Sequence, residues 1–172
     1  QTCALPIFTE KGIITFAHSK TFESLQSLSL GWNGITVTAL QALAKSPWLQ
    51  KIVSLNVKNN GLGDEGVQIV AASKTLVNLQ KLDLGWSKIS SKGVEILAKS
   101  SIVKNLQSLK LDGNYVGDCG AFEIARSKGL VALEHLSLYR NNITFLGVKA
   151  LVQSENLQSI TDLNLAKNNL GD

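Results

Sequence analysis

Residues 106–127 read LQSLKLDGNYVGDCGAFEIARS, and this stretch decides how the rest of the chain is organised. Leucines stand at 106, 109 and 111, followed by Asn114, Val116 and Gly120. Apolar residues two apart on a strand share one face, so the second and third leucines point inward together. The residues after Gly120 suit a helix. The stretch therefore predicts one short strand, one loop and one helix.

The same pattern recurs every 27 residues, five more times, without an insertion. We number the repeats 1 to 6 by their first leucine position, which runs Leu25, Ile52, Leu79, Leu106, Leu133 and Ile160. Recurrence at this period is typical of a solenoid, in which each unit is stabilised by its neighbours. The sequence thus predicts one elongated domain.

The loop after each strand carries a second regular feature. An asparagine occupies its turn in every repeat except one, in the order Asn33, Asn60, Ser87, Asn114, Asn141 and Asn168. A row of side-chain amides can satisfy backbone groups from repeat to repeat, and Ser87 interrupts that row. Helix caps are expected from short polar residues, namely Thr36, Asp64, Ser90 or Ser91, Asp118 and Thr144. The glycine in the first helical turn predicts close packing of each helix on its neighbour.

The two ends of the chain differ from the repeats. Residues 1–7 read QTCALPI, which matches the translation of a common sequencing adapter. We interpret residues 1–8 as a non-native segment and residues 9–172 as a solenoid of about six repeats. Residues 11–19 fit the helical half of a repeat, and residues 168–172 stop where another helix would start. The expectation is a fragment truncated at both ends.

Composition narrows the classes of function. The chain has 44% hydrophobic residues, 17% charged residues and no apolar run near the ~20 residues of a membrane span. The net charge of +4 is spread among acidic residues, which argues against nucleic acid as the partner. Cys3 and Cys119 form no metal-ligand pattern, so no metal or cofactor is expected. Their scarcity favours an intracellular location, and the sequence does not indicate an oligomeric state.

The strand residues that face outward form the candidate binding surface. Large side chains also stand two positions after the third leucine, and Trp32 and Trp86 there should lie about 10 Å apart across one intervening strand. Trp, Tyr and Arg often dominate binding energy. The alternative is that these rings fold against the loop and only pack. The candidate residues are Trp32, Lys58, Asn59, Asp83, Trp86, Lys110, Asp112, His135, Tyr139 and Arg140.

One set of residues resembles a catalytic triad. Ser108, His135 and Asp162 occupy the same position on three successive strands, facing outward. A hydrolase would also need a strained nucleophile turn, oxyanion donors and a pocket that excludes water, and the sequence offers none of them. We therefore interpret His135 and Asp162 as a surface ion pair and expect no catalytic residues.

The 27-residue period, the leucine and asparagine positions and the phrase at 60–66, NGLGDEG, resemble the ribonuclease-inhibitor-like class of leucine-rich-repeat proteins. The resemblance implies an α/β solenoid shaped as a right-handed horseshoe, with a parallel sheet on the concave face and helices on the convex face. Such proteins are mostly protein-binding modules, which implies a non-enzymatic module that binds a protein or peptide along the concave face. The alternative is a substrate-recognition or regulatory segment of a larger enzyme, such as a ubiquitin-ligase subunit or a Ran-type GTPase activator.

Overall fold

The computed structural model describes residues 9–171, and the segment interpreted as adapter-derived, residues 1–8, lies outside them. The described residues form one six-stranded parallel sheet in the order β1-β2-β3-β4-β5-β6. Each strand pairs with the next at a shift of 27 residues, as Leu82 with Leu109. The strands are β1 (Ser27–Ser29), β2 (Ser54–Asn56), β3 (Lys81–Asp83), β4 (Ser108–Lys110), β5 (His135–Ser137) and β6 (Asp162–Asn164).

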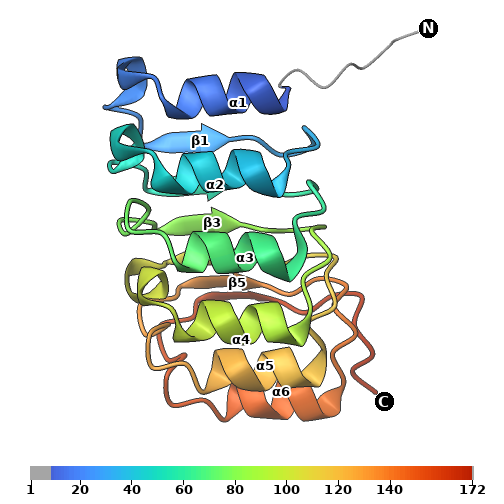
Figure 1. The fold of residues 1–172 in the computed structure, drawn as a ribbon. Coiled ribbons are helices and arrows are strands. Elements are labelled where there is room, and N and C mark those ends of the chain that lie inside the picture. The colour runs from blue at the N-terminus through green and yellow to red at the C-terminus, as the bar shows by residue number, and fades with distance from the viewer. Residues whose placement is uncertain (1–8, 172) are drawn as a thin grey trace, which may run out of the picture.

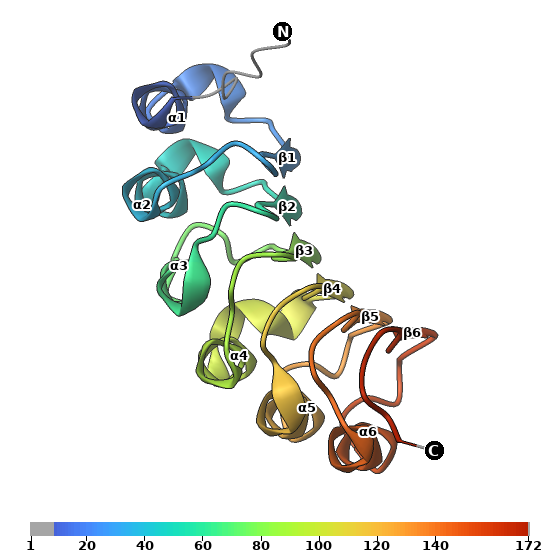
Figure 2. The same cartoon turned by 90° about the vertical axis from the view of Figure 1, so that its right-hand side faces the viewer.

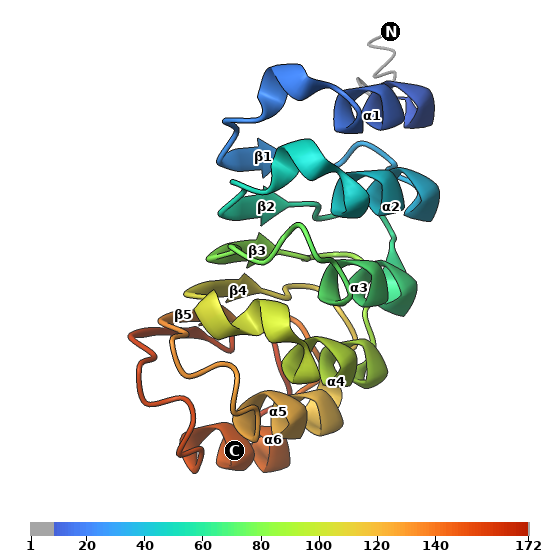
Figure 3. The same cartoon turned by 60° about the vertical axis from the view of Figure 1, so that its left-hand side comes forward.

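Helices alternate with these strands along the described chain. The α-helices are α1 (Glu10–Ala17), α2 (Val37–Lys45), α3 (Gly63–Ala71), α4 (Ser91–Lys99), α5 (Gly117–Ala125) and α6 (Phe145–Val152). Short 3-10 helices follow three of them, at η1 (Lys20–Phe22), η2 (Pro47–Leu49) and η3 (Ser101–Asn105). Figure 1 shows the units stacked in chain order, and Figure 3 shows the same stack from another side.

The stack bends because helices are wider than strands. Packed helices lie ~8–10 Å apart and paired strands ~4.8 Å apart, so the helical side must follow the longer arc. Figure 2 shows this arc, with the strands along its inner side and the helices along its outer side. The predicted α/β solenoid, with the sheet concave and the helices convex, is confirmed.

The core lies between the sheet and the helices and follows the leucine positions. Leu82, Leu109 and Leu136, in the middle strands, are each 1% exposed. Burial decreases at the last strand, where Leu163 is 39% exposed because no further repeat covers it within the described residues. Each repeat is thus buried by its neighbours, as expected for a solenoid.

The predicted row of asparagines is present, and its side chains form hydrogen bonds from one repeat to the preceding one. Asn114 Oδ1 accepts the N–H groups of Ser87 and Ile89, each at 3.0 Å, from the preceding repeat. Its Nδ2 donates to the carbonyls of Leu84 at 3.1 Å and Leu111 at 2.8 Å. Ser87 is fully buried, and its side chain bonds only within its own loop, through a 3.1 Å donation to the Gly85 carbonyl. The interruption of the row at Ser87 is therefore confirmed.

A second row, formed by serines, was not predicted. The serine after a helix generally donates to the carbonyl of one of the last two residues of the preceding helix, as Ser73 Oγ to Ala44 at 2.6 Å and Ser127 Oγ to Ala98 at 2.6 Å. Ser100 instead donates to Leu97 of its own helix. The sequence shows a serine at every such position but not the direction of its hydroxyl. The solenoid therefore has polar rows on both sides of the leucine core.

The prediction of helix caps is correct for three residues and wrong for two. Thr36, Ser90 and Thr144 precede their helices and accept a backbone N–H with the side chain, as expected. Asp64 and Asp118 instead lie inside the first turns of α3 and α5, which have no side-chain cap. The cause is a tighter loop in repeats 2 and 4, where Gly63 and Gly117 take the left-handed conformation and the helix begins earlier.

These two aspartates bond to the following repeat. Asp118 accepts the N–H and hydroxyl of Thr144 at 2.8 and 2.7 Å, and also the N–H of Gly147 at 2.9 Å. A Cβ on Gly147 would lie 2.5 Å from the Asp118 carboxylate, so the helical glycine makes room for it. Asp64 holds Ser90 in the same way. The close packing predicted from the glycines is present, and at these repeats its partner is a carboxylate.

Candidate functional site

The chain turns at the carboxyl edge of the sheet, three residues beyond each strand, and this turn fixes the direction of one side chain per repeat. The residues there have φ between 52 and 64° and are Trp32, Asn59, Trp86, Gly113, Arg140 and Lys167. A left-handed backbone costs an L residue roughly 1–2 kcal/mol, so glycine would be the least strained choice. Only one of these six described positions is glycine.

The sheet hydrogen bonds continue up to this turn. The N–H of Trp32 donates to the Lys58 carbonyl at 3.0 Å, and the N–H of Arg140 donates to the Ala166 carbonyl at 2.9 Å. The first five turns are thereby held by the next repeat. The side chains at the turns form a row along the carboxyl edge of the concave sheet.

Trp86 is the centre of a cluster that crosses three repeats. Its ring lies over Gly113, where a Cβ would come within 2.4 Å of a ring atom. The guanidinium carbon of Arg140 lies 5.7 Å from the centroid of the ring, within the range of a cation–π contact. Trp86 nevertheless remains 40% exposed. The ring is positioned by packing and still presents surface to solvent.

Trp32 is the more open of the two tryptophans, at 67% exposed. Its neighbour Asn59 and the nearby Lys58 are half-buried, and the Lys58 side chain lies over Gly31. Tyr139 is also half-buried. The alternative, in which the rings only pack against the loop, therefore fits the exposed Trp32 poorly and fits Trp86 only in part.

Asp83 and Asp112 are engaged with the turns themselves. Asp83 Oδ1 accepts the N–H of Gly85 at 3.0 Å. Asp112 Oδ1 accepts the hydroxyl of Ser137 and, at 3.1 Å, the N–H of Tyr139. Both carboxylates thus shape the backbone that presents the larger side chains.

The strands carry a shallow hollow of about 420 Å³ beside this row. It contains Asp83, Lys110 and His135, so the candidate residues divide into a strand group and a turn group. The hollow also includes residues that were not singled out as binding residues: Ser54, Asn56, Lys81, Gln107, Ser108 and Glu134. Four of them, Ser54, Asn56, Lys81 and Ser108, share the outward position on the strands, which is the signal that could have identified them. Gln107 and Glu134 directly precede β4 and β5.

The row that resembles a triad does not assemble one. The strand register places Ser108 beside His135 and His135 beside Asp162. His135 Nδ1 lies 3.8 Å from Asp162 Oδ2, and both side chains are largely exposed. Among residues 9–171 no hydrogen bond joins Ser108 to His135. The arrangement places together the two surface residues that the sequence suggested as a pair.

Within residues 9–171, no group of three or more His, Cys, Asp or Glu side chains could hold a metal ion. None of the helices described there has the length and apolar character needed to span a membrane. Cys119 is free and exposed.

Comparisons with known proteins agree with this architecture. The sequence matches the family described as Leucine Rich repeat over residues 23–44, 49–71, 75–98 and 156–172, which together make up half of the chain. A search of curated proteins gave no match. Among solved structures, an internalin from Listeria monocytogenes has a similar fold, with a TM-score of 0.58 and 21% sequence identity. The alignment covers 89% of this chain and 45% of the internalin chain, so this chain spans less than half the length of that protein. The chain belongs to the leucine-rich repeat family.

Proposed function

We propose that this chain is a non-enzymatic protein-interaction module of the ribonuclease-inhibitor-like class, and that it binds a protein or peptide along its concave face. The observation that carries the proposal is the row of side chains at the carboxyl edge. Strained turns hold large residues there in repeats 1, 3 and 5, where a glycine would fold more easily. A structural role alone would not require tryptophan.

The partner contacts would be concentrated around the Trp86 cluster. Trp86 and Arg140 contact each other, so they present a rigid surface that loses little side-chain entropy on binding. Trp32 extends the row in one direction, and the strand hollow supplies polar groups beside it. Asp83, Lys110 and His135 in the hollow would set the orientation of the partner.

The test begins with capture of a partner from an extract of the source organism, followed by titration of variants. Trp86→Ala and Tyr139→Ala should each weaken binding by about 2 kcal/mol or more, the typical effect at a binding hot spot, and Arg140→Ala should have a similar effect. Circular dichroism should show that the variants remain folded, because these side chains lie outside the leucine core.

Matched controls lie on the outer helices. Glu95→Ala and Lys149→Ala change charged surface residues far from the sheet in the repeat pattern, and they should leave the affinity unchanged. If affinity falls only with these two variants, the partner binds the convex side and the proposal is wrong. If Trp86→Ala unfolds the chain, the ring is a core residue.

A further inference from the structure

A second hollow, of about 560 Å³, lies between the C-terminal ends of α4 and α5. Its charged lining consists of four basic side chains, Lys99, Lys104, Arg126 and Lys128, and one acidic side chain, Glu123. The charge of the lining is therefore four minus one, or +3, whereas the whole chain carries +4. The side chains that line the hollow therefore carry an excess of positive charge.

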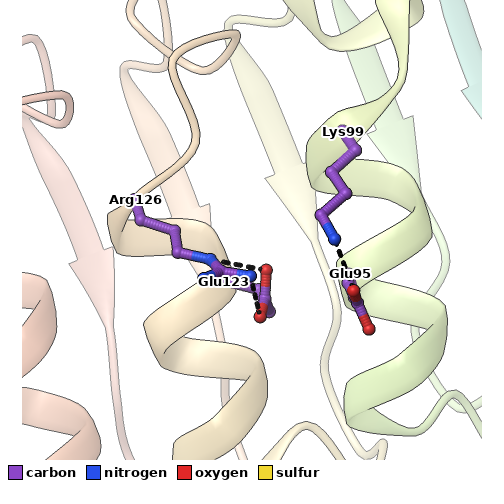
Figure 4. Close-up of polar contacts among 4 residues, drawn as sticks. All are labelled: Glu95, Lys99, Glu123 and Arg126. Atoms are coloured by element: carbon purple, nitrogen blue, oxygen red, sulfur yellow. Dashed lines mark hydrogen bonds and ion pairs between the residues drawn. The ribbon is translucent and has the colours of Figure 1, made fainter.

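Half of the basic residues have a structural explanation. Lys99 ends α4 and Arg126 follows α5, where a cation complements the negative end of the helix dipole. Figure 4 shows that Lys99 pairs with Glu95, and that Arg126 binds Glu123 with two nitrogens, at 2.7 and 2.9 Å. These pairs stabilise the helix surfaces.

The other half has no such explanation. Lys104 lies on η3 and Lys128 lies in the segment after α5, and both are exposed. Neither belongs to an ion pair within residues 9–171. Their charges face the hollow without a carboxylate of the described chain to neutralise them.

The repeats provide an internal comparison. Two repeats earlier, a hollow of about 580 Å³ between α2 and α3 contains Lys45 and Lys74, at the positions of Lys99 and Lys128. In the sequence, the residues two repeats before Lys104 and Arg126 are the uncharged Gln50 and Ala72. The excess of positive charge is therefore particular to repeats 3 and 4 and does not follow from the fold.

The charge also ends abruptly in the following repeat. Gln153 and Glu155 stand one repeat after Arg126 and Lys128, so the sign reverses there. A nucleic-acid backbone requires a basic stripe that continues over a longer distance. The two helices lie ~8–10 Å apart, and an extended peptide advances ~3.3 Å per residue. The width of the patch therefore equals the length of roughly three extended residues.

We propose that this hollow binds a short acidic segment of a partner protein. Lys104 and Lys128 supply the free positive charges that attract the segment. Arg126 offers a guanidinium that can bind a carboxylate with two hydrogen bonds, but only when it releases Glu123. Glu123 is therefore a competitor inside the site, and the proposal does not depend on the concave face.

The experiment measures binding of a labelled tetraglutamate peptide by fluorescence anisotropy, with tetraglutamine as the uncharged probe. The double variant Lys104→Gln and Lys128→Gln should weaken tetraglutamate about tenfold, the combined effect of two exposed ion pairs. The matched control is Lys45→Gln with Lys74→Gln in the equivalent hollow, and it should change the affinity less than about twofold. Tetraglutamine should not bind.

A third variant separates this site from a general effect of charge. Glu123→Gln removes the competing carboxylate, so tetraglutamate should bind more tightly, even though an intrahelical pair is lost. Equal weakening by both lysine pairs would overturn the proposal, as would the absence of tetraglutamate binding. A short single-stranded DNA that binds more tightly than the peptide, and loses affinity in the same variants, would also overturn it.

Discussion

At the scale of single residues, Ser87 shows how much one side chain matters to the asparagine row. Asn141 occupies the same position two repeats later and is equally buried. Its Nδ2 donates to the carbonyls of Leu111 at 2.8 Å and Tyr139 at 3.1 Å, and its Oδ1 accepts the N–H of Val116. Ser87 makes only one of the corresponding bonds. An amide therefore fits this position in an almost identical loop.

We expect Ser87→Asn to raise the free energy of unfolding by about 1 kcal/mol, the usual net value of a buried hydrogen bond. The measurement is urea denaturation of the two proteins. Ser87→Ala is the control, since it removes the existing bond to Gly85 and should destabilise. A loss of stability in Ser87→Asn would show that the space at residue 87 suits only a small side chain.

Asp118 gives a prediction for pH. Burial alone would raise the pKa of Asp118, but hydrogen bonds from the Thr144 hydroxyl and from the N–H groups of Thr144 and Gly147 lower it below the ordinary 3.8. The unfolded state then binds the proton more readily than the folded state. The contribution of Asp118 to stability is present above 3.8 and is lost as the pH falls through the lowered pKa.

Thermal unfolding of the natural protein and of Asp118→Asn, measured over a range of pH, checks this prediction. The melting temperature of the variant should be lower at neutral pH, and the difference should narrow as the pH falls below 3.8. A difference that stays constant across this range would show that the negative charge of Asp118 does not stabilise the fold.

At the scale of the secondary-structure elements, the strands are too short to be stable alone. Each has three residues, and its stability comes from burial against the strands on either side. Leu109 and Leu136 have such neighbours and are 1% exposed, whereas Leu163 is 39% exposed. Truncation of a buried leucine to alanine costs about 2–5 kcal/mol because it leaves a cavity.

Leu109→Ala and Leu136→Ala should therefore each lower the free energy of unfolding by about 2–5 kcal/mol, and Leu163→Ala should lower it much less. Chemical denaturation of the three variants is the measurement. Equal losses at all three positions would mean that β6 is covered as completely as the central strands in solution.

The strands and helices could be predicted from the sequence because the same pattern of apolar residues recurs in every repeat at the same spacing. The pairing of Leu82 with Leu109 follows from the period alone. The period could not show that Gly117 would take a left-handed turn and move Asp118 into the helix. Nor could it show that the Trp86 ring would lie over Gly113 and reach Arg140, since that depends on the backbone angle of Trp86 and on a missing Cβ.

At the scale of the whole molecule, the solenoid should not open uniformly. The central strands are paired on both sides, and β1 and β6, at the two edges of the described sheet, are paired on one side only. The free energy of local opening should therefore be highest for β3 and β4 and lowest for β1 and β6. Asparagine bonds between repeats transmit this coupling, as Asn114 links repeats 3 and 4.

Hydrogen exchange of backbone amides can measure this gradient. The N–H of Leu84, bonded to Lys110 at 2.9 Å, should exchange more slowly than the N–H groups of β1 and β6. In Leu109→Ala, protection should fall most in repeats 3 to 5, because the cavity weakens the contacts of repeat 4 with both neighbours. Equal protection in all six strands would contradict this prediction, since the repeats would then open together, as a single cooperative unit does.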